Sequence, residues 1–187
     1  MAASGRMQPL LFMPSRLAAA MVVVVVSANV LVQFPINDWL TWGAATYPVS
    51  FLITDIANRF HGPKIARRVL YVGFVIAVIL SIYFSTARIA LASGTAFLIA
   101  QLLDVRVFDQ LRSDVWWKAP LISSLVGSAV DTALFFSIAF YATTVPWVTL
   151  AIGDFIVKIV LAQIMLIPFS IAYKSYLETT RSREPDQ

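Results

Sequence analysis

Six apolar stretches, each long enough to cross a lipid bilayer, constrain this chain more than any other feature of its sequence. A membrane-spanning helix needs about 20 mostly apolar residues. Stretches of roughly that length recur with only short polar breaks between them, over about residues 17–33, 39–58, 69–85, 88–108, 119–141 and 147–173. The pattern predicts an all-α, polytopic membrane protein that folds as a compact bundle of six transmembrane helices.

The composition excludes the main classes of soluble protein. Hydrophobic residues make up 59% of the chain and charged residues 13%, whereas soluble domains average about 45–50% and about 25%. A water-soluble enzyme, a disordered chain and a nucleic-acid-binding domain are therefore not expected. The chain has no cysteine and one histidine, His61, so no disulfide framework, cysteine nucleophile or zinc cluster is expected. We predict neither enzymatic activity nor a cofactor or metal.

The basic residues predict the orientation of the chain. Twelve of the 14 lysines and arginines lie in the terminal segments and in the breaks after the second and fourth stretches, and Arg88 alone lies in the alternate breaks. Because cytoplasmic loops carry the excess of basic residues, both termini should face the cytoplasm. We predict a cytoplasmic arm over residues 1–16, a transmembrane domain over 17–173 and a polar cytoplasmic tail over 174–187. The last residues of the tail, 179–187, are expected to be disordered.

Three ionisable residues within the last two stretches are the strongest candidates for a site, because a charge at the bilayer centre costs about 2.5–3.5 kcal/mol. Asp131 and Lys158 lie near the middle of their stretches, and Asp154 lies toward the outer side. Asp154 and Lys158 are four residues apart and share a helix face. They form either a self-neutralising ion pair or the wall of a pocket. Asp131 has no basic residue three or four positions away. It is either neutralised by Lys158 or Arg88 from another helix or it binds a solute or a proton, and its central depth favours the second interpretation.

Polar residues in the other stretches form a second set of candidates. Asn29 and Gln101 suit hydrogen bonds between helices or to a solute. Asp55 is expected either to pair with Arg59 at the membrane interface or to bind solute. The remaining candidates are Arg88, Asp104 and Tyr47, a residue that precedes a predicted kink at Pro48 in the second helix.

Several strings of residues resemble one family, the queuosine precursor transporters, also called the VUT family. The strings occur in the family's order, over roughly residues 27–170. They are SANVLVQFP (27–35), TWGAATYPVSFLITD (41–55), RFHGPKIARR (59–68), ARIALA (87–92), QLLDVRVFDQLR (101–112), WWKAP (116–120), GSAVDTALFFSIAF (127–140) and GDFIVK (153–158).

The resemblance implies uptake of 7-deazaguanines across the bacterial inner membrane, namely 7-cyano-7-deazaguanine and 7-aminomethyl-7-deazaguanine. These compounds are salvaged for queuosine in transfer RNA. The resemblance also implies six membrane helices in an architecture similar to the substrate-binding subunits of energy-coupling-factor vitamin transporters. The alternative function is therefore such a binding subunit, which would need an ATPase partner because the chain has no Walker motif.

The chemistry of a 7-deazaguanine matches the candidate residues. Its imide N–H and 2-amino group are adjacent donors that one carboxylate accepts together, and we assign that role to Asp131. Lys158, Asn29 or Gln101 is expected to face its carbonyl group. Asp154 is expected to hold Lys158 or to neutralise an aminomethyl group. The expected partners are this small molecule and the lipid bilayer, without nucleic acid, and Ser124 with Ser128 suggests a homodimer through close helix packing.

The distribution of basic residues generates a topology prediction. Reporter proteins fused at Thr144 and after Gln187 should report opposite sides of the membrane, because an odd number of crossings separates the two positions. Alkaline phosphatase and green fluorescent protein fusions measure this directly. If both positions reported the same side, the six-helix topology would be wrong.

Overall fold

The computed structural model describes residues 14–31, 35–37, 40–42, 46–84 and 86–181 of the chain. This part is helical apart from one short antiparallel ribbon of two strands. The elements are α1 (Pro14–Leu31), β1 (Pro35–Asn37), β2 (Leu40–Thr41), α3 (Pro48–His61), α4 (Pro63–Phe84), α5 (Ala87–Leu111), α6 (Lys118–Phe140) and α7 (Trp147–Arg181). The predicted helical fold, with six helices in the described ranges, is confirmed. By length and composition, α5, α6 and α7 are apolar enough to cross a membrane.

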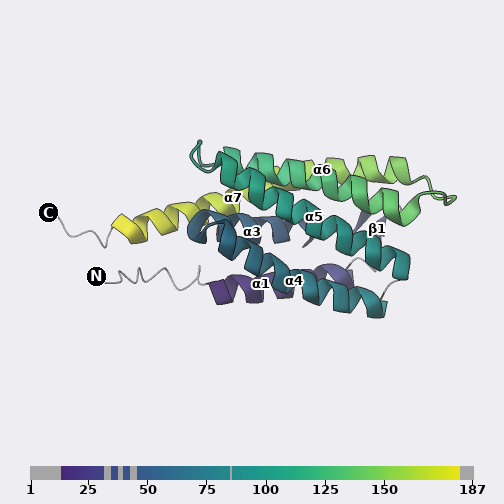
Figure 1. Cartoon of the computed structure of the whole chain (residues 1–187). Helices are drawn as coiled ribbons and strands as arrows, with labels where there is room; N and C mark the ends of the chain where they lie inside the picture. Colours follow the sequence, from purple (N-terminus) through teal and green to yellow (C-terminus); the bar gives the residue numbers. More distant parts are fainter. Residues whose placement is uncertain (1–13, 32–34, 38–39, 43–45, 85, 182–187) are drawn as a thin grey trace.

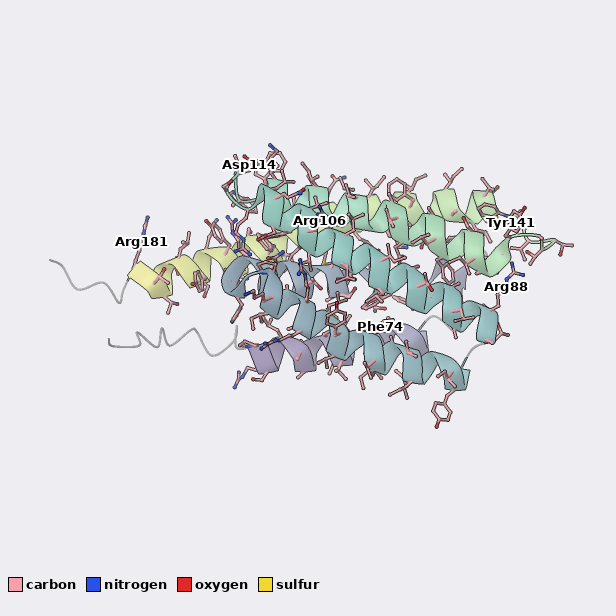
Figure 2. All side chains as sticks on the ribbon, viewed as in Figure 1. Phe74, Arg88, Arg106, Asp114, Tyr141 and Arg181 are labelled. Carbon is pink, nitrogen blue, oxygen red and sulfur yellow. The ribbon has the colours of Figure 1, made fainter. Side chains whose placement is uncertain are left out.

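The helices run along one common direction and alternate in sense (Figure 1). α5 lies beside α6, α1 lies beside α4, and α3 lies between these two pairs. The start of α1 and the end of α7 are at the same end of the bundle. Asp114 and Arg181 lie at that end, whereas Arg88 and Tyr141 lie at the other (Figure 2). The loops predicted to share one side of the membrane are thus together in space.

The predicted second helix, over residues 39–58 with a kink at Pro48, is wrong at its start, because Leu40–Thr41 form the strand β2. The helix α3 begins at Pro48, and residues 43–45 lie outside the described part of the chain. Proline lacks an N–H group, which the first turn of a helix does not need, so it is stable at a helix start and costly in the interior. With 14 residues and about 1.5 Å of rise per residue, α3 by itself is shorter than the roughly 30 Å core of a bilayer.

The predicted disorder of the polar tail is wrong for its first residues, because α7 continues to Arg181. The end of α7 packs on the end of α3. The rings of Phe60 and Tyr176 stack with centroids 4.5 Å apart, and the Arg59 guanidinium lies 4.8 Å from the centre of the Tyr173 ring. These contacts hold the helix beyond the apolar stretch that the sequence defines. Residues 182–187 lie outside the described part of the chain.

The apolar core is divided between two clusters that both involve α3. The larger one joins α1, α3, α4 and α5 and includes Met21, Leu70 and Phe97. The smaller one joins α5, α6 and α7 through Phe108, Ala119 and Phe169, with α3 packed against it. As a result, α3 contacts α1, α4, α5, α6 and α7. The shortest of the described helices is therefore the central one.

The small residues of α6 pack inside the bundle rather than on its surface. Ser124 is 8% exposed and Ser128 is 3% exposed. The pair therefore does not offer a contact face to a second copy of the chain, and the predicted homodimer has no support from these residues. Small residues in membrane helices also allow neighbouring helices within one bundle to pack closely. The burial of Ser124 and Ser128 agrees with that role.

Close packing of α5 against α6 generates a prediction at Gly127. A β-carbon there would lie 2.7 Å from Cε1 of the buried Phe51 and 3.3 Å from the carbonyl oxygen of Ala100. Gly127→Ala should therefore lower the free energy of unfolding by about 1–3 kcal/mol, as overpacked cores do. Thermal unfolding in detergent micelles measures the effect.

Gly94 in α5 is the matched control, because a β-carbon there meets its nearest atom at 3.7 Å, an ordinary contact. Gly94→Ala should leave stability unchanged or slightly raised, since alanine favours helix over glycine by about 1 kcal/mol. An equal loss in both variants would contradict this account of the contact between α5 and α6.

Candidate functional site

The Lys158 ammonium group of α7 lies between two carboxylates. Its Nζ is 2.8 Å from Oδ2 of Asp131 on α6 and 2.6 Å from Oδ2 of Asp154 one turn earlier on α7. Nζ also donates to the Thr132 hydroxyl at 3.1 Å, and that hydroxyl donates to Asp154 at 2.7 Å. All three N–H groups of the ammonium are thereby satisfied. The predicted pair of Asp154 and Lys158 is confirmed, and so is the contact of Asp131 with Lys158 that was one of the two alternatives.

Tyr47 completes this cluster from the start of α3. Its hydroxyl donates to Oδ1 of Asp131 at 3.0 Å, and Lys158 Nζ lies 5.6 Å from the centre of its ring. The residue is in this position because the helix begins directly after it, at Pro48. The break in the second apolar stretch therefore presents the tyrosine ring to a buried ion cluster. We call Tyr47, Asp131, Thr132, Asp154 and Lys158 the lysine cluster.

The lysine cluster carries an excess of negative charge. It contains two carboxylates and one ammonium group, and the side chains of Asp131 and Lys158 are each 7% exposed. Among the described residues, no other cation forms an ion pair with either carboxylate. A buried charge is costly unless it is paired. The cluster can therefore accept a ligand that brings a positive charge or strong hydrogen-bond donors.

A layer of neutral polar groups lies one to two turns further along α3. The amide of Gln101 on α5 accepts from the Thr54 hydroxyl at 2.7 Å and donates to the Ser50 hydroxyl at 2.9 Å. Ser50 in turn donates to the carbonyl oxygen of Tyr47 at 2.7 Å. Gln101 thus forms the interhelical hydrogen bonds that were one interpretation of it. Gln101 is also connected, through Ser50, to the backbone of Tyr47, the residue whose hydroxyl binds Asp131.

Asp55 follows Thr54 directly on α3 and lies near Asp104 of α5. The Asp55 carboxylate accepts from the hydroxyls of Ser123 and Ser124 on α6 at 3.2 and 3.3 Å. The expected ion pair of Asp55 with Arg59 does not form. Arg59 instead donates to the carbonyl oxygen of Arg112, because its long side chain extends toward the end of the bundle whereas Asp55 is 2% exposed.

The last polar layer closes the end of α3. The amide of Asn58 donates to the carbonyl oxygen of Val105 at 2.9 Å, and the Arg112 guanidinium donates to the side-chain and backbone oxygens of Asn58. Arg112 also pairs with Asp109 at 3.4 Å. Polar side chains at positions 47, 50, 54, 55 and 58 therefore follow one another along α3 at the spacing of a helix face. We call these five residues the polar face of α3.

Two predicted site residues are not part of these layers in the described structure. Arg88 lies at the opposite end of the bundle, where it donates to the carbonyl oxygens of Ile138 and Tyr141 at 2.9 and 2.5 Å. It covers the last carbonyl groups of α6, where a cation is favourable, and it does not approach Asp131. The side chain of Asn29 lies outside what the structure describes, although the residue itself belongs to α1.

A small cavity borders the polar face of α3. It lies among α1, α3, α4 and α5, and Tyr47, Ser50 and Phe97 are in its wall. Its volume is about 20 Å³, which is close to the space of one water molecule. A bicyclic solute does not fit unless Tyr47 or a neighbouring helix moves.

Sequence reasoning missed several polar residues that complete these layers. Thr132, Ser123 and Ser124 bind the aspartates, and Ser50 and Thr54 bind Gln101. Hydroxyl residues are common in membrane helices, so composition alone does not mark them. Their signal is position: Thr132 adjoins Asp131, and Ser50 and Thr54 share a helix face with Tyr47 and Asn58.

Comparisons with known proteins agree on one family. The family model described as "Putative vitamin uptake transporter" matches residues 41–173. "Queuosine precursor transporter" of Escherichia coli (strain K12) is 34% identical over 174 residues, with 78% of this chain and 79% of the relative covered. "Probable queuosine precursor transporter" of Haemophilus influenzae is 33% identical over 186 residues with the same coverage, and one of Bacillus subtilis (strain 168) is 28% identical over 168 residues, with 73% and 72% covered. No solved structure matches the chain.

The lysine cluster generates a stability prediction. Lys158→Met leaves the buried Asp131 and the partly buried Asp154 without their shared cation, so the free energy of unfolding should fall by about 3–5 kcal/mol. The double variant Lys158→Met with Asp154→Asn should recover part of the loss, because it removes one of the two uncompensated charges. Thermal unfolding in micelles measures both.

Lys118→Met is the matched control, because Lys118 forms an ion pair of similar length, 2.7 Å, with Asp114 at the exposed end of the bundle. An exposed pair contributes about 0–1 kcal/mol, so this variant should be nearly as stable as the parent. Equal losses of stability in the two variants would show that the lysine cluster contributes no more to stability than an exposed ion pair does.

Proposed function

The chain belongs to the vitamin uptake transporter family, and from this premise we propose that it imports queuosine precursors across the bacterial inner membrane. The proposed substrates are 7-cyano-7-deazaguanine and 7-aminomethyl-7-deazaguanine. The observation that carries the proposal is the buried Lys158 between Asp131 and Asp154, next to Tyr47. In a chain with this much apolar surface, such a cluster is costly to insert and is explained by a polar solute.

The proposed binding mode starts from Asp131. Its Oδ1 accepts a hydrogen bond from the neutral Tyr47 hydroxyl, a donor that can be exchanged for donors on a ligand. The imide N–H and 2-amino group of a 7-deazaguanine are two such donors, at the spacing that a carboxylate accepts. Lys158 then supplies the donor that the ring carbonyl needs. Gln101, and Asn29 by prediction, complete the polar edge of the site.

Rotation of Tyr47 away from Asp131 would open the way to the neighbouring cavity. That cavity already has Phe97 in its wall, and the rings of Tyr47 and Phe97 meet edge to face at 5.9 Å. A flat heterocycle needs such aromatic and apolar walls for its faces. We therefore propose that the ring of the substrate lies between the lysine cluster and Phe97, in a space that forms when the helices around Tyr47 separate.

The excess negative charge of the lysine cluster favours the aminomethyl substrate. This compound carries an ammonium group at neutral pH, and Asp154, which is 18% exposed, is the more accessible of the two carboxylates. The cyano compound is neutral and gains only the hydrogen bonds. We therefore expect the aminomethyl compound to bind more tightly, through a charge-assisted contact that contributes about 1.5–3 kcal/mol.

Both termini are proposed to face the cytoplasm. The support is the position of the start of α1 and the end of α7 at the same end of the bundle, together with the basic residues at that end. The alternative function, a binding subunit that depends on an ATPase partner, shares this topology. Proteoliposomes that contain only this chain separate the two, since a binding subunit retains labelled substrate binding but does not accumulate substrate inside the vesicle.

Asp131→Asn tests the proposed site. Asparagine keeps the size of the side chain but replaces one acceptor oxygen with a donor, so it repels the imide or 2-amino group. We expect affinity for either 7-deazaguanine to fall about ten- to hundredfold, since each factor of ten corresponds to about 1.4 kcal/mol. The measurement is binding and uptake of labelled substrate at equal amounts of folded protein.

Asp114→Asn is the control, because Asp114 forms an exposed ion pair with Lys118 at the end of the bundle. It should leave affinity unchanged. Full affinity in Asp131→Asn, with a loss in Asp55→Asn instead, would move the substrate site toward the end of α3 and would refute this assignment.

A further inference from the structure

The lysine cluster leaves two buried aspartates of the bundle without a role. Asp55 of α3 is 2% exposed and Asp104 of α5 is fully buried. Both residues adjoin the same stretch of α6, because Asp55 binds Ser123 and Ser124 and the β-carbon of Asp104 lies 3.4 Å from where a β-carbon of Gly127 would be. Their carboxyl groups are close enough to interact electrostatically. Asp55 accepts from two serine hydroxyls of α6, whereas neither carboxylate oxygen of Asp104 has a hydrogen-bond donor among the described side and main chains.

No cation compensates this carboxyl pair in the described part of the chain. From α3, the nearby Arg59 is bound to the carbonyl oxygen of Arg112. From α5, Arg112 is bound to Asn58 and Asp109. From α6, only the neutral hydroxyls of Ser123 and Ser124 reach the pair.

The remaining helices add no cation either. Lys158 of α7 is occupied by Asp131 and Asp154, the end of α7 that packs nearby supplies Phe169, and Arg67 and Arg68 of α4 are exposed. Metal-ligating side chains do not gather here in groups of three or more within the described residues.

Two neighbouring carboxylates that are buried and without a counter-charge cannot both be ionised. A single proton removes the repulsion: on Asp55 it supplies a donor to Asp104, and on Asp104 it lets that carboxyl group donate to Asp55. We propose that Asp55 and Asp104 form a proton-binding site, and that one proton enters the cell through this site with each substrate molecule. The coupling, though not the proton site, rests on the proposed function.

The position of the pair on the polar face of α3 supports coupling to the lysine cluster. Eight residues separate Tyr47 from Asp55, which is about 12 Å along a helix. The hydrogen bonds of Ser50, Thr54 and Gln101 occupy the interval. Movement of Tyr47 or of α3 that admits substrate therefore also moves Asp55 relative to Asp104 of α5. The O–H bond forms while the pair is open to the outer side and breaks, with release of the proton, when the pair opens to the cytoplasm.

The proton site is tested first by infrared spectroscopy of the full chain in lipid vesicles at neutral pH, without substrate. The expected result is a protonated carboxyl band that shifts in heavy water and that is lost in Asp104→Asn and in Asp55→Asn. Asparagine resembles the neutral carboxyl group in shape, so both variants should fold. Absence of such a band in the parent protein overturns the proposal even if a variant is not obtained.

The coupling is tested by accumulation of labelled 7-cyano-7-deazaguanine, a neutral substrate, in proteoliposomes of the whole protein. With one proton per substrate, the limiting accumulation ratio should rise about tenfold for each pH unit of inward gradient. Asp104→Asn should abolish this dependence but keep exchange of labelled for unlabelled substrate. The control Asp114→Asn should behave as the parent protein does.

Each outcome decides a separate point. A gradient dependence that persists in both Asp55→Asn and Asp104→Asn overturns the coupling at this site. Uptake by the parent protein that does not depend on the pH gradient overturns proton coupling altogether. A protein that shows the infrared band but neither binds nor moves a 7-deazaguanine overturns the proposed function, and with it the coupling, while the proton site stands.

Discussion

The contact of Lys158 with both Asp131 and Asp154 is the interaction on which the arrangement of α3, α6 and α7 depends. Burying one ammonium group without partners costs several kcal/mol, so α6 must bring Asp131 within 2.8 Å of it. The Tyr47 hydroxyl then has an acceptor directly before the start of α3. A single charge requirement therefore brings α6 and α7 together at Asp131 and Lys158, and Tyr47 adds the start of α3 to the same cluster.

The short α3 concentrates the polar groups of the bundle. Its first polar residue, Tyr47, contacts Asp131, Phe51 and Phe97 and borders the small cavity. From there the polar face of α3 continues through the Gln101 layer to the buried carboxyl pair, so the proposed substrate site and the proposed proton site share one helix.

How far the sequence predicted the site depended on whether the partners were near in the chain. Asp154 and Lys158 are one helical turn apart, so their pairing followed from spacing alone. Asp131 pairs with the same lysine from another helix. Spacing in the sequence could not decide between Lys158 and other possible partners for this contact. For Asp55, spacing indicated an ion pair that does not form. Arg59 is correctly spaced for this pair, but its side chain extends toward Tyr173 and Arg112 instead. Local spacing identifies which side chains can meet, and the surroundings decide which do.

The sequence by itself determined that the chain is a helical membrane protein, which residues carry charge inside it, and which family it resembles. These follow from hydropathy, from the bias of basic residues and from strings of residues, all of which are local properties. Only the tertiary structure decided that the second stretch breaks at Pro48, that α7 extends to Arg181 and that Asp55 faces Asp104. Each of these depends on packing between helices that are distant in the chain, such as the stacking of Phe60 on Tyr176. A sequence pattern that repeats every few residues does not reveal such contacts.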